Sequence, residues 1–492
     1  MVSENEGFQF LLTKEDKRNL LILLIAAIAL RLYAFSQIYL ISTDGAFQYI
    51  PTAMLFYEGK YLQALTQPQL PLYPFLISLL NRIIGNPELA GQIISIFFSI
   101  LALIPLYFLG KYLFSSKPAF WATLLYVIHP DMLRYSVDVL KEGLVIFCFL
   151  SSMYFSIRFL RERRGVWLIW TVTFTVMGAL SRITALSILL ALGVWLGYCV
   201  LRGGLKDKRV IFLYLGVLLL SFGIIVIFVI PGIWGWEVMM TKKHYGVARE
   251  IVTGLFGYQW PSVSYIAKKL GYGVVNFLND AYPLPISLAF IGIGWRVKKK
   301  EFVTEEGYLI LFMVIILSSF FIRDSVRYLL PAIFMSYLWA GLGFVKVRDF
   351  IDRRYKRHPN LNTFVIVTVL VLSIVPLSLK PQRLDKIGRK EVGLWLRERS
   401  LSKPLIVTNV PRVAYYAGGS HIRIYNLAMP IESIIKIGKD NNANYLVLEK
   451  KRGAADISYY LAPFEQQGLV TLLLRYPYGK EGRVIYVYWF HE

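Results

Sequence analysis

Ser42-Thr43-Asp44-Gly45-Ala46-Phe47-Gln48-Tyr49 follows directly on the first long apolar run of the sequence, residues 20–40. This position puts the Asp44 carboxylate at the edge of a membrane, where an ion costs free energy unless it has a partner or a chemical task. Asp44 is therefore our candidate for the residue that does the chemistry. The structural alternative is an N-cap, because aspartate is favoured there and a short helix is expected to begin at Gly45. The two roles are compatible.

The composition is that of a multi-span membrane protein. Of the 492 residues, 56% are hydrophobic and 17% are charged, whereas a soluble domain has about 25% charged residues. The formal net charge of +23 does not indicate a nucleic-acid partner, because the basic residues cluster between apolar runs as cytoplasmic loops do. Residues 20–40 are too long for the core of a signal peptide, so we interpret them as a retained anchor.

The alternation of apolar runs with basic clusters predicts the topology. Residues 75–84 are short for a span, which needs about 20 residues, so we expect a re-entrant segment. With the N-terminus inside, this choice keeps the basic loops inside and puts Asp44 and Asp138 on the outer face. This topology predicts about eleven spans. They cover residues 20–40, 89–113, 119–128, 139–160, 167–180, 185–201, 211–230, 274–295, 308–322, 329–345 and 364–379.

The predicted fold is thus an α-helical multi-span membrane domain, residues 1–379, with its first outer loop at 42–87. From residue 380 the composition becomes that of a soluble protein. Strands are expected at 405–408, 445–448 and 484–490, and helices at 384–399, 412–417 and 431–439. These elements predict a small extracytoplasmic α/β domain, residues 380–492. It has no Gly-rich phosphate loop, so no nucleotide binding is assigned.

Other ionisable residues are predicted at the outer face beside Asp44. They are Arg134, Asp138, Lys141, Glu142, Arg182 and Arg327, the last followed by Tyr328. Charges at span ends favour a functional role, yet each has a structural alternative. Asp138, Lys141 and Glu142 lie within about one helical turn and can pair with one another. Arg182 and the Arg327-Tyr328 pair can anchor span ends at the interface.

The order of these segments resembles that of the GT-C membrane glycosyltransferases, most closely the branch of protein O-mannosyltransferases and aminoarabinose transferases. Asp44 in Thr43-Asp44-Gly45, the proline-rich stretch 68–74, Asp138 in stretch 134–142 and Arg327-Tyr328 carry the resemblance, which covers roughly the first 345 residues. It implies transfer of a sugar from a polyprenyl-phosphate carrier to an acceptor protein, lipid or glycan, with inversion at the anomeric carbon. The expected location is the outer face of a prokaryotic plasma membrane.

An inverting transfer needs one carboxylate to take the proton of the attacking hydroxyl, and Asp44 fits this role. The leaving lipid phosphate needs cations, which Arg134, Lys141, Arg182 and Arg327 can supply. Asp138, Glu142 and Tyr328 are assigned with them to donor-phosphate or substrate binding. Some relatives hold a divalent cation through paired acids near the second acidic position. Valines flank Asp138 here, so no obligatory metal is expected, and a divalent cation is kept as an alternative.

Two other functions remain open. A transporter or flippase of lipid-linked sugars would also need charges on the outer face. Such proteins often have two related halves, and the sequence has no internal repeat. An O-antigen ligase or polymerase is chemically similar, but it typically lacks an early acidic motif and has a large outer loop late in the chain.

Overall fold

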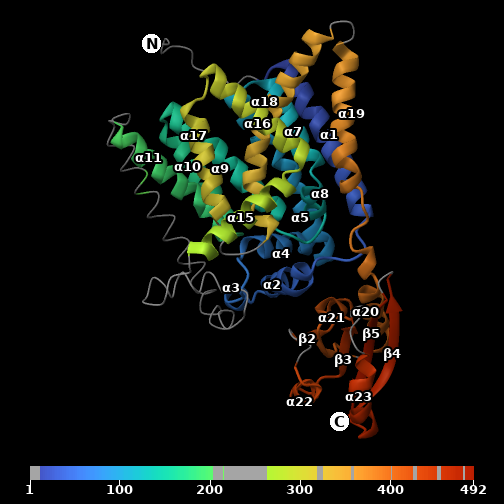
Figure 1. Ribbon diagram of the computed structural model, residues 1–492. Helices are drawn as coiled ribbons and strands as arrows, with labels where there is room; N and C mark the ends of the chain where they lie inside the picture. Colours follow the sequence, from blue (N-terminus) through green and yellow to red (C-terminus); the bar gives the residue numbers. More distant parts are fainter. Residues whose placement is uncertain are drawn as a thin grey trace.

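The computed structural model describes residues 12–202, 214, 216, 263–318, 325–355, 359–400, 402–424, 429–450, 456–479 and 482–491. It shows a helical bundle with a smaller α/β unit at one end (Figure 1). The predicted span at 211–230 lies outside the described residues, apart from two isolated positions.

The first half of the bundle contains the outer-loop helices that the sequence predicts. Its elements are α1 (Lys14–Ser36), the π-helix η1 (Gly45–Tyr49), α2 (Ile50–Tyr57), α3 (Tyr61–Leu65), α4 (Leu72–Ile84), α5 (Pro87–Leu101), α6 (Leu103–Leu113), α7 (Ser116–Ile128), α8 (Pro130–Ser136), α9 (Glu142–Glu162), α10 (Gly165–Ala179), η2 (Ile183–Leu186) and α11 (Ser187–Leu201). The second half comprises α15 (Val263–Asp280), α16 (Pro283–Lys299), α17 (Thr304–Ser318), η5 (Val326–Tyr328), α18 (Leu330–Arg354) and α19 (Pro359–Ser378).

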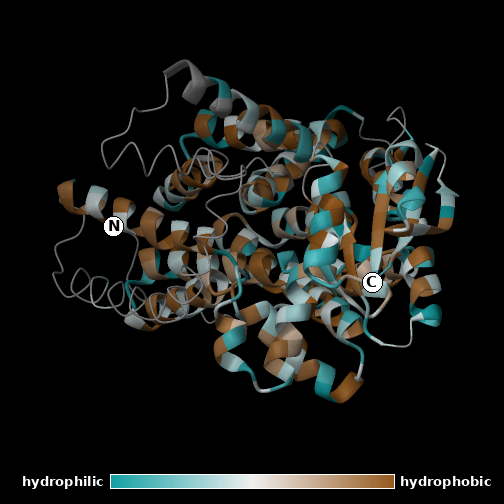
Figure 2. Cartoon of the chain, turned by 90° about the horizontal axis from the view of Figure 1, so that it is seen from below, coloured by the Kyte–Doolittle hydropathy of each residue, from teal (hydrophilic) through white to brown (hydrophobic). Residues whose placement is uncertain are grey.

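Within the described residues, six helices are long and apolar enough to cross a membrane. A seventh is added if the bent pair α15–α16 is one span. Hydrophobic residues lie along the helices of the bundle (Figure 2), and many are exposed, as a lipid-facing surface requires. Leu21, Ile25 and Leu32 of α1 and Phe364 and Leu372 of α19 are more than half exposed. The chain is therefore a multi-pass membrane protein, and the total of about eleven spans stays a prediction.

The span predicted at 274–295 is not one continuous helix. Helix α15 ends at Asp280 and α16 begins at Pro283, with an angle of 103° between Gly271–Asp280 and α16. The cause is local: a proline cannot continue a helix that reaches it, and Tyr282 adopts a positive φ of 62° just before it. Hydropathy alone does not detect such a break, because the two helices together are apolar enough to pass as one span.

Helices α16 and α18 pack closely through glycine. A Cβ atom at Gly292 would overlap the backbone carbonyl oxygen of Trp339, and one at Gly343 would overlap that of Leu288. Two helix backbones can come this close only where neither carries a side chain. Gly294, two residues after Gly292 on α16, faces open space instead.

Replacing Gly292 with alanine is therefore expected to destabilise the bundle by about 1–3 kcal/mol, because backbone has to move to admit the methyl group. Thermal unfolding of the detergent-purified protein measures the change. Gly294→Ala is the matched control, since it adds the same methyl group to the same helix and meets nothing within 4 Å. Equal melting temperatures for the two variants would contradict the close contact.

The C-terminal unit, residues 380–491, is built around one five-stranded sheet in the order β2-β1-β3-β5-β4. Strand β1 pairs in parallel with β2 and β3, whereas β5 pairs antiparallel with β3 and β4. The strands are β1 (Leu405–Thr408), β2 (Ser420–Arg423), β3 (Tyr445–Lys450), β4 (Val470–Tyr478) and β5 (Arg483–Phe490). The helices are the short η6 (Leu384–Lys386), α20 (Gly388–Arg399), α21 (Pro411–Tyr416), α22 (Ile431–Asp440) and α23 (Ile457–Gln466).

Helices cover both faces of this sheet. Leu446 and Tyr488 belong to a core that includes residues of α22 and α23. Val447 and Val487 are the adjacent residues on the same strands. They belong to a core that includes residues of α20 and α21. This alternation is what a strand buried on both sides produces. The strands predicted at 405–408, 445–448 and 484–490 are confirmed, as are the helices at 412–417 and 431–439, with small shifts of their ends.

Candidate functional site

Asp44 stands at the start of η1, where the chain leaves the connection from α1. Its side chain makes no capping hydrogen bond. The Gly45 N–H instead donates to Ser42 Oγ at 2.9 Å. The predicted N-cap role of Asp44 is therefore wrong, because Ser42 fulfils it. The Asp44 carboxylate, 29% exposed, accepts a hydrogen bond from Arg327 Nη1 at 2.8 Å.

Glu142, the first residue of α9, lies close to the same arginine. The side chain is fully buried, and its Oε1 is 2.5 Å from Arg182 Nη2 and 3.5 Å from Arg327 Nη1. One guanidinium nitrogen of Arg327 thus contacts both carboxylates. Glu142 Oε2 is buried and has no hydrogen-bond partner among the described residues. We call Asp44, Glu142, Arg182 and Arg327 the Asp44–Glu142 network.

Arg182 holds this network together from the segment between α10 and η2. Its Nη1 donates to the Arg327 carbonyl at 2.8 Å, and its guanidinium carbon lies 4.8 Å from the centre of the Tyr328 ring. Only 6% of its side chain is exposed, so it is not an anchor that reaches out to the interface. The network therefore ties the start of α9, the end of α10 and the segment before α18 to the Asp44 turn.

Lys141 adds a titratable charge beside the network. Its Nζ lies 5.7 Å from the centre of the Tyr49 ring, at the far end of η1 from Asp44. Burial lowers the pKa of Lys141 to about 7, assisted by the positive charge of Arg182 and opposed by Glu142. The two negative charges of the carboxylates and the two positive charges of the guanidinium groups in the network cancel. With Lys141 protonated the site carries one net positive charge, which suits an anionic ligand.

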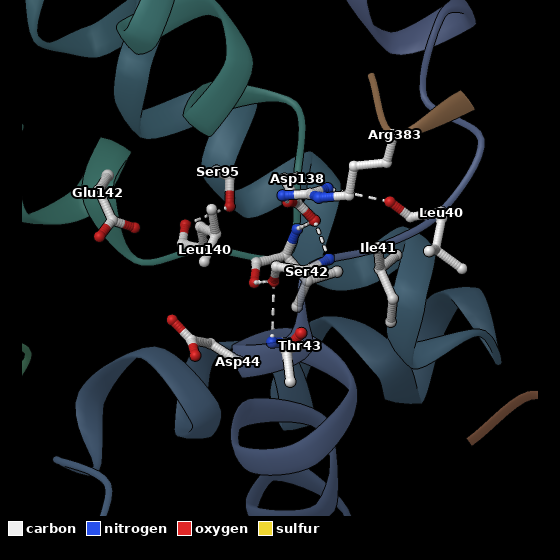
Figure 3. Close-up of polar contacts among 12 residues, drawn as sticks. Leu40, Ile41, Ser42, Thr43, Asp44, Ser95, Asp138, Leu140, Glu142 and Arg383 are labelled. Atoms are coloured by element: carbon white, nitrogen blue, oxygen red, sulfur yellow. Dashed lines mark hydrogen bonds and ion pairs between the residues drawn. The ribbon is translucent and has the colours of Figure 1, made fainter. Parts of the chain in front are cut away.

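Asp138 points away from this network. The side chain is fully buried, and its Oδ1 accepts from the backbone N–H groups of Ser42 and Val139 at 2.9 and 2.7 Å. Its Oδ2 lies 2.5 Å from Arg383 Nη2 (Figure 3). Asp138 and Asp44 lie at the same end of the bundle, as predicted. The geometry gives Asp138 a structural task, and its contact with donor or substrate stays a prediction.

Arg134 likewise stands apart from the network. Its Nη1 is 3.8 Å from Asp131 Oδ1, one turn earlier on α8, and 53% of its side chain is exposed. Sequence reasoning missed Ser42 and Arg383. The sequence contained a signal for Ser42: serine is a favoured N-cap, and its hydroxyl can accept the backbone N–H three residues later, here that of Gly45. The only signal for Arg383 in the sequence is its position just after the last predicted span.

The carboxylates of the site are paired with arginines and are not gathered around a common point. Each of the three already faces a guanidinium group: Asp44 faces Arg327, Glu142 faces Arg182, and Asp138 faces Arg383. Among the described residues there is no group of three His, Cys, Asp or Glu side chains that could share an ion. Metal ligands in proteins need several such oxygens turned to one point. No chemical step is therefore assigned to a metal.

Comparison with solved structures shows the fold. The archaeal oligosaccharyltransferase AglB from Archaeoglobus fulgidus, in complex with an inhibitory peptide and a dolichol-phosphate, aligns over 96% of this chain and 74% of its own with 12% identity and a TM-score of 0.61. ArnT from Cupriavidus metallidurans, bound to undecaprenyl phosphate, aligns over 95% and 97% with 12% identity and a TM-score of 0.58. The Archaeoglobus fulgidus oligosaccharyltransferase in complex with Zn and sulfate aligns over 88% of this chain and 68% of its own, with 12% identity and a TM-score of 0.57.

The fold is thus that of the GT-C membrane glycosyltransferases, and the resemblance predicted from segment order is confirmed. The sequence supports the same group in one region: the family of dolichyl-phosphate-mannose-protein mannosyltransferases matches residues 66–234. A search among curated proteins gives no match.

Proposed function

We propose that the chain is an inverting glycosyltransferase, which moves a sugar from a polyprenyl-phosphate carrier to an acceptor hydroxyl at the outer face of a prokaryotic plasma membrane. The observation that carries the proposal is the Asp44–Glu142 network. It places the partly exposed carboxylate of Asp44 against Arg327, beside the buried pair of Glu142 and Arg182, at one end of a membrane bundle. The neighbours support the donor class, because AglB was solved with a dolichol-phosphate and ArnT with undecaprenyl phosphate.

The proposed reaction needs one base and a site for a leaving anion. The acceptor oxygen attacks the anomeric carbon opposite the phosphate, and the bond from that carbon to the phosphate oxygen breaks as the new one forms. Asp44 takes the acceptor proton. The polyprenyl phosphate leaves with one more negative charge, which Arg327 and Arg182 stabilise without providing a proton. Glu142 keeps both arginines in place, since its Oε1 lies 2.5 Å from Arg182 and 3.5 Å from Arg327.

The test is a transfer assay on the purified protein in detergent. Radiolabelled polyprenyl-phosphate sugars are incubated with protein, lipid and glycan acceptors, and both products are followed. A transferase forms labelled acceptor and free polyprenyl phosphate in equal amounts. A transporter or flippase makes neither, because detergent removes the two compartments and it forms no bond. Hydrolysis of donor with no acceptor product would reject the proposed function.

Donor binding is expected to weaken above neutral pH if the Lys141 ammonium contacts the phosphate. Lys141 has a pKa of about 7, so it loses its charge between pH 6 and 8. The KM for donor then rises with pH by up to about tenfold per unit. In Lys141→Arg the charge persists, and the KM is expected to stay flat over this range. Parallel pH profiles for the two proteins would exclude Lys141 from donor binding.

The same pKa has a consequence for stability. Between pH 7 and the usual lysine range the unfolded chain binds more protons at Lys141 than the folded one. The contribution of Lys141 to the free energy of unfolding therefore rises with pH over that window and is constant below it. Loss of donor binding above pH 7 in the wild type thus does not reflect unfolding through this group.

A further inference from the structure

The connection between α1 and η1, residues 37–43, contacts the C-terminal unit along its length. The Gln382 N–H donates to the Gln37 carbonyl at 3.0 Å, and Ile38 forms an isolated parallel β-bridge with Gln382. Arg383 Nη1 then donates to the Leu40 carbonyl at 2.9 Å. The first half of the connection is therefore fixed by the two residues where the chain enters the C-terminal unit.

Helix α21 contacts the second half of the connection. The Ile41 N–H donates to the Tyr416 hydroxyl at 3.3 Å, and Arg412 Nε donates to Thr43 Oγ1 at 3.1 Å. Thr43 immediately precedes Asp44. One turn further on, the Phe47 ring lies 4.7 Å from the ring of His421 on β2. The C-terminal unit thus contacts the backbone or side chains on both sides of Asp44.

Asp138 connects the two halves. It accepts the Ser42 N–H while its second oxygen pairs with Arg383 (Figure 3). The carboxylate is fully buried, so the loss of either contact would leave a charge or a donor unsatisfied in a dry environment. Arg383 therefore holds the Ser42 backbone through Asp138 and the Leu40 backbone directly.

We infer that Arg383 is a positioning residue for Asp44, and that the C-terminal unit sets the place of the proposed base. Apart from the isolated bridge at Ile38, residues 37–42 form no helix or strand, so these contacts determine their path. Arg383 itself contacts Asp138 and Leu40, so it acts on Asp44 through the connection that precedes it. A base displaced by about 1 Å can lose about 10²-fold in rate. This inference rests on the proposed function.

The first test is Arg383→Met in the transfer assay. We expect kcat to fall by about 10- to 100-fold with the KM for donor unchanged, because the phosphate-binding cations are untouched. Arg383→Lys keeps the charge opposite Asp138 and is expected to recover part of the rate. Arg389→Met is the matched control: Arg389 makes a buried pair with Glu449 in the same unit, at 2.6 Å. It should lower the melting temperature and leave kcat per folded molecule unchanged.

Two outcomes separate positioning from a general structural role. In an Asp44→Asn background, Arg383→Met should cause no further loss, because Arg383 acts through Asp44. An equal loss in both backgrounds, or a wild-type kcat for folded Arg383→Met, overturns the inference. If Asp44→Asn alone is fully active, the role of Asp44 as base fails, and if the wild type transfers no sugar, the proposed function fails, so these failures are distinguishable from that of the inference.

A disulfide keeps the inference testable even if Arg383→Met folds poorly. Ile38→Cys with Gln382→Cys joins bridged positions about 5 Å apart, a separation that a disulfide spans. The background is Cys199→Ser, because Cys199 is the partly exposed native thiol. Oxidation should restore kcat in the Arg383→Met variant and leave the parent protein active. Reversible inhibition of the parent by oxidation would show that this contact opens during turnover, and would overturn the inference.

Discussion

Asparagine at position 44 is expected to lower kcat for sugar transfer by about 10²- to 10⁴-fold, the usual contribution of a general base. The change keeps the size of the side chain and an oxygen that can still accept from Arg327, whose Nη1 lies 2.8 Å from the carboxylate. It removes the ability to take a proton. The KM for donor should change little, because the arginines remain in place. Initial rates at saturating donor measure the effect.

Asp131→Asn is the control for Asp44→Asn. Asp131 is another carboxylate in the membrane domain, paired with Arg134 and outside the Asp44–Glu142 network. Its replacement should leave the rate within about twofold of wild type, because Asp131 pairs with Arg134 outside the network. An undiminished rate in Asp44→Asn would reject Asp44 as the base. It would also remove the basis for assigning Arg383 a positioning role.

Local sequence patterns predict the parts of this molecule that depend on short stretches of chain. The apolar runs give most of the helices, and the alternation of basic clusters puts Asp44 and Asp138 at the same end of the bundle. Strands β1, β3 and β5 follow from their hydrophobic runs. Strand β4 was missed because its residues alternate only weakly and Pro477 argues against a strand. The sheet order is compatible with that proline, since β4 is an edge strand, where proline is tolerated.

The sequence does not show which acidic side chain pairs with which basic side chain. Asp138, Lys141 and Glu142 are close in sequence, and pairing among themselves was a reasonable alternative. The structure separates them: Asp138 pairs with Arg383 and Glu142 with Arg182. Those partners come from other segments, and tertiary packing alone brings them together. The same holds for Arg412 and Tyr416, whose contacts with residues 37–43 depend on how the C-terminal unit sits against the bundle.

Arg327→Met is the second substitution with a large expected effect, a fall in kcat of about 10²- to 10³-fold. That is the size of effect seen when one group that stabilises developing negative charge is removed. Arg327 Nη1 is 2.8 Å from Asp44 and 3.5 Å from Glu142. When the donor phosphate enters, this guanidinium has other nitrogens to offer it while Nη1 keeps hold of Asp44. Lysine has one compact ammonium and cannot do both, so Arg327→Lys should recover only a small part of the rate.

Arg134→Met is the matched control for Arg327→Met, because Arg134 pairs with Asp131 and is half exposed. A fall of less than about threefold is expected, in line with the loss of an exposed ion pair. Arg327→Met should also reduce thermal stability, since fully buried Glu142 then loses one of its two guanidinium contacts and keeps Arg182. The two effects are separable: addition of donor can restore stability by binding but cannot restore kcat. A variant that keeps wild-type kcat at lower stability would make Arg327 a structural residue, and the leaving phosphate would then need Arg182 and Lys141 alone.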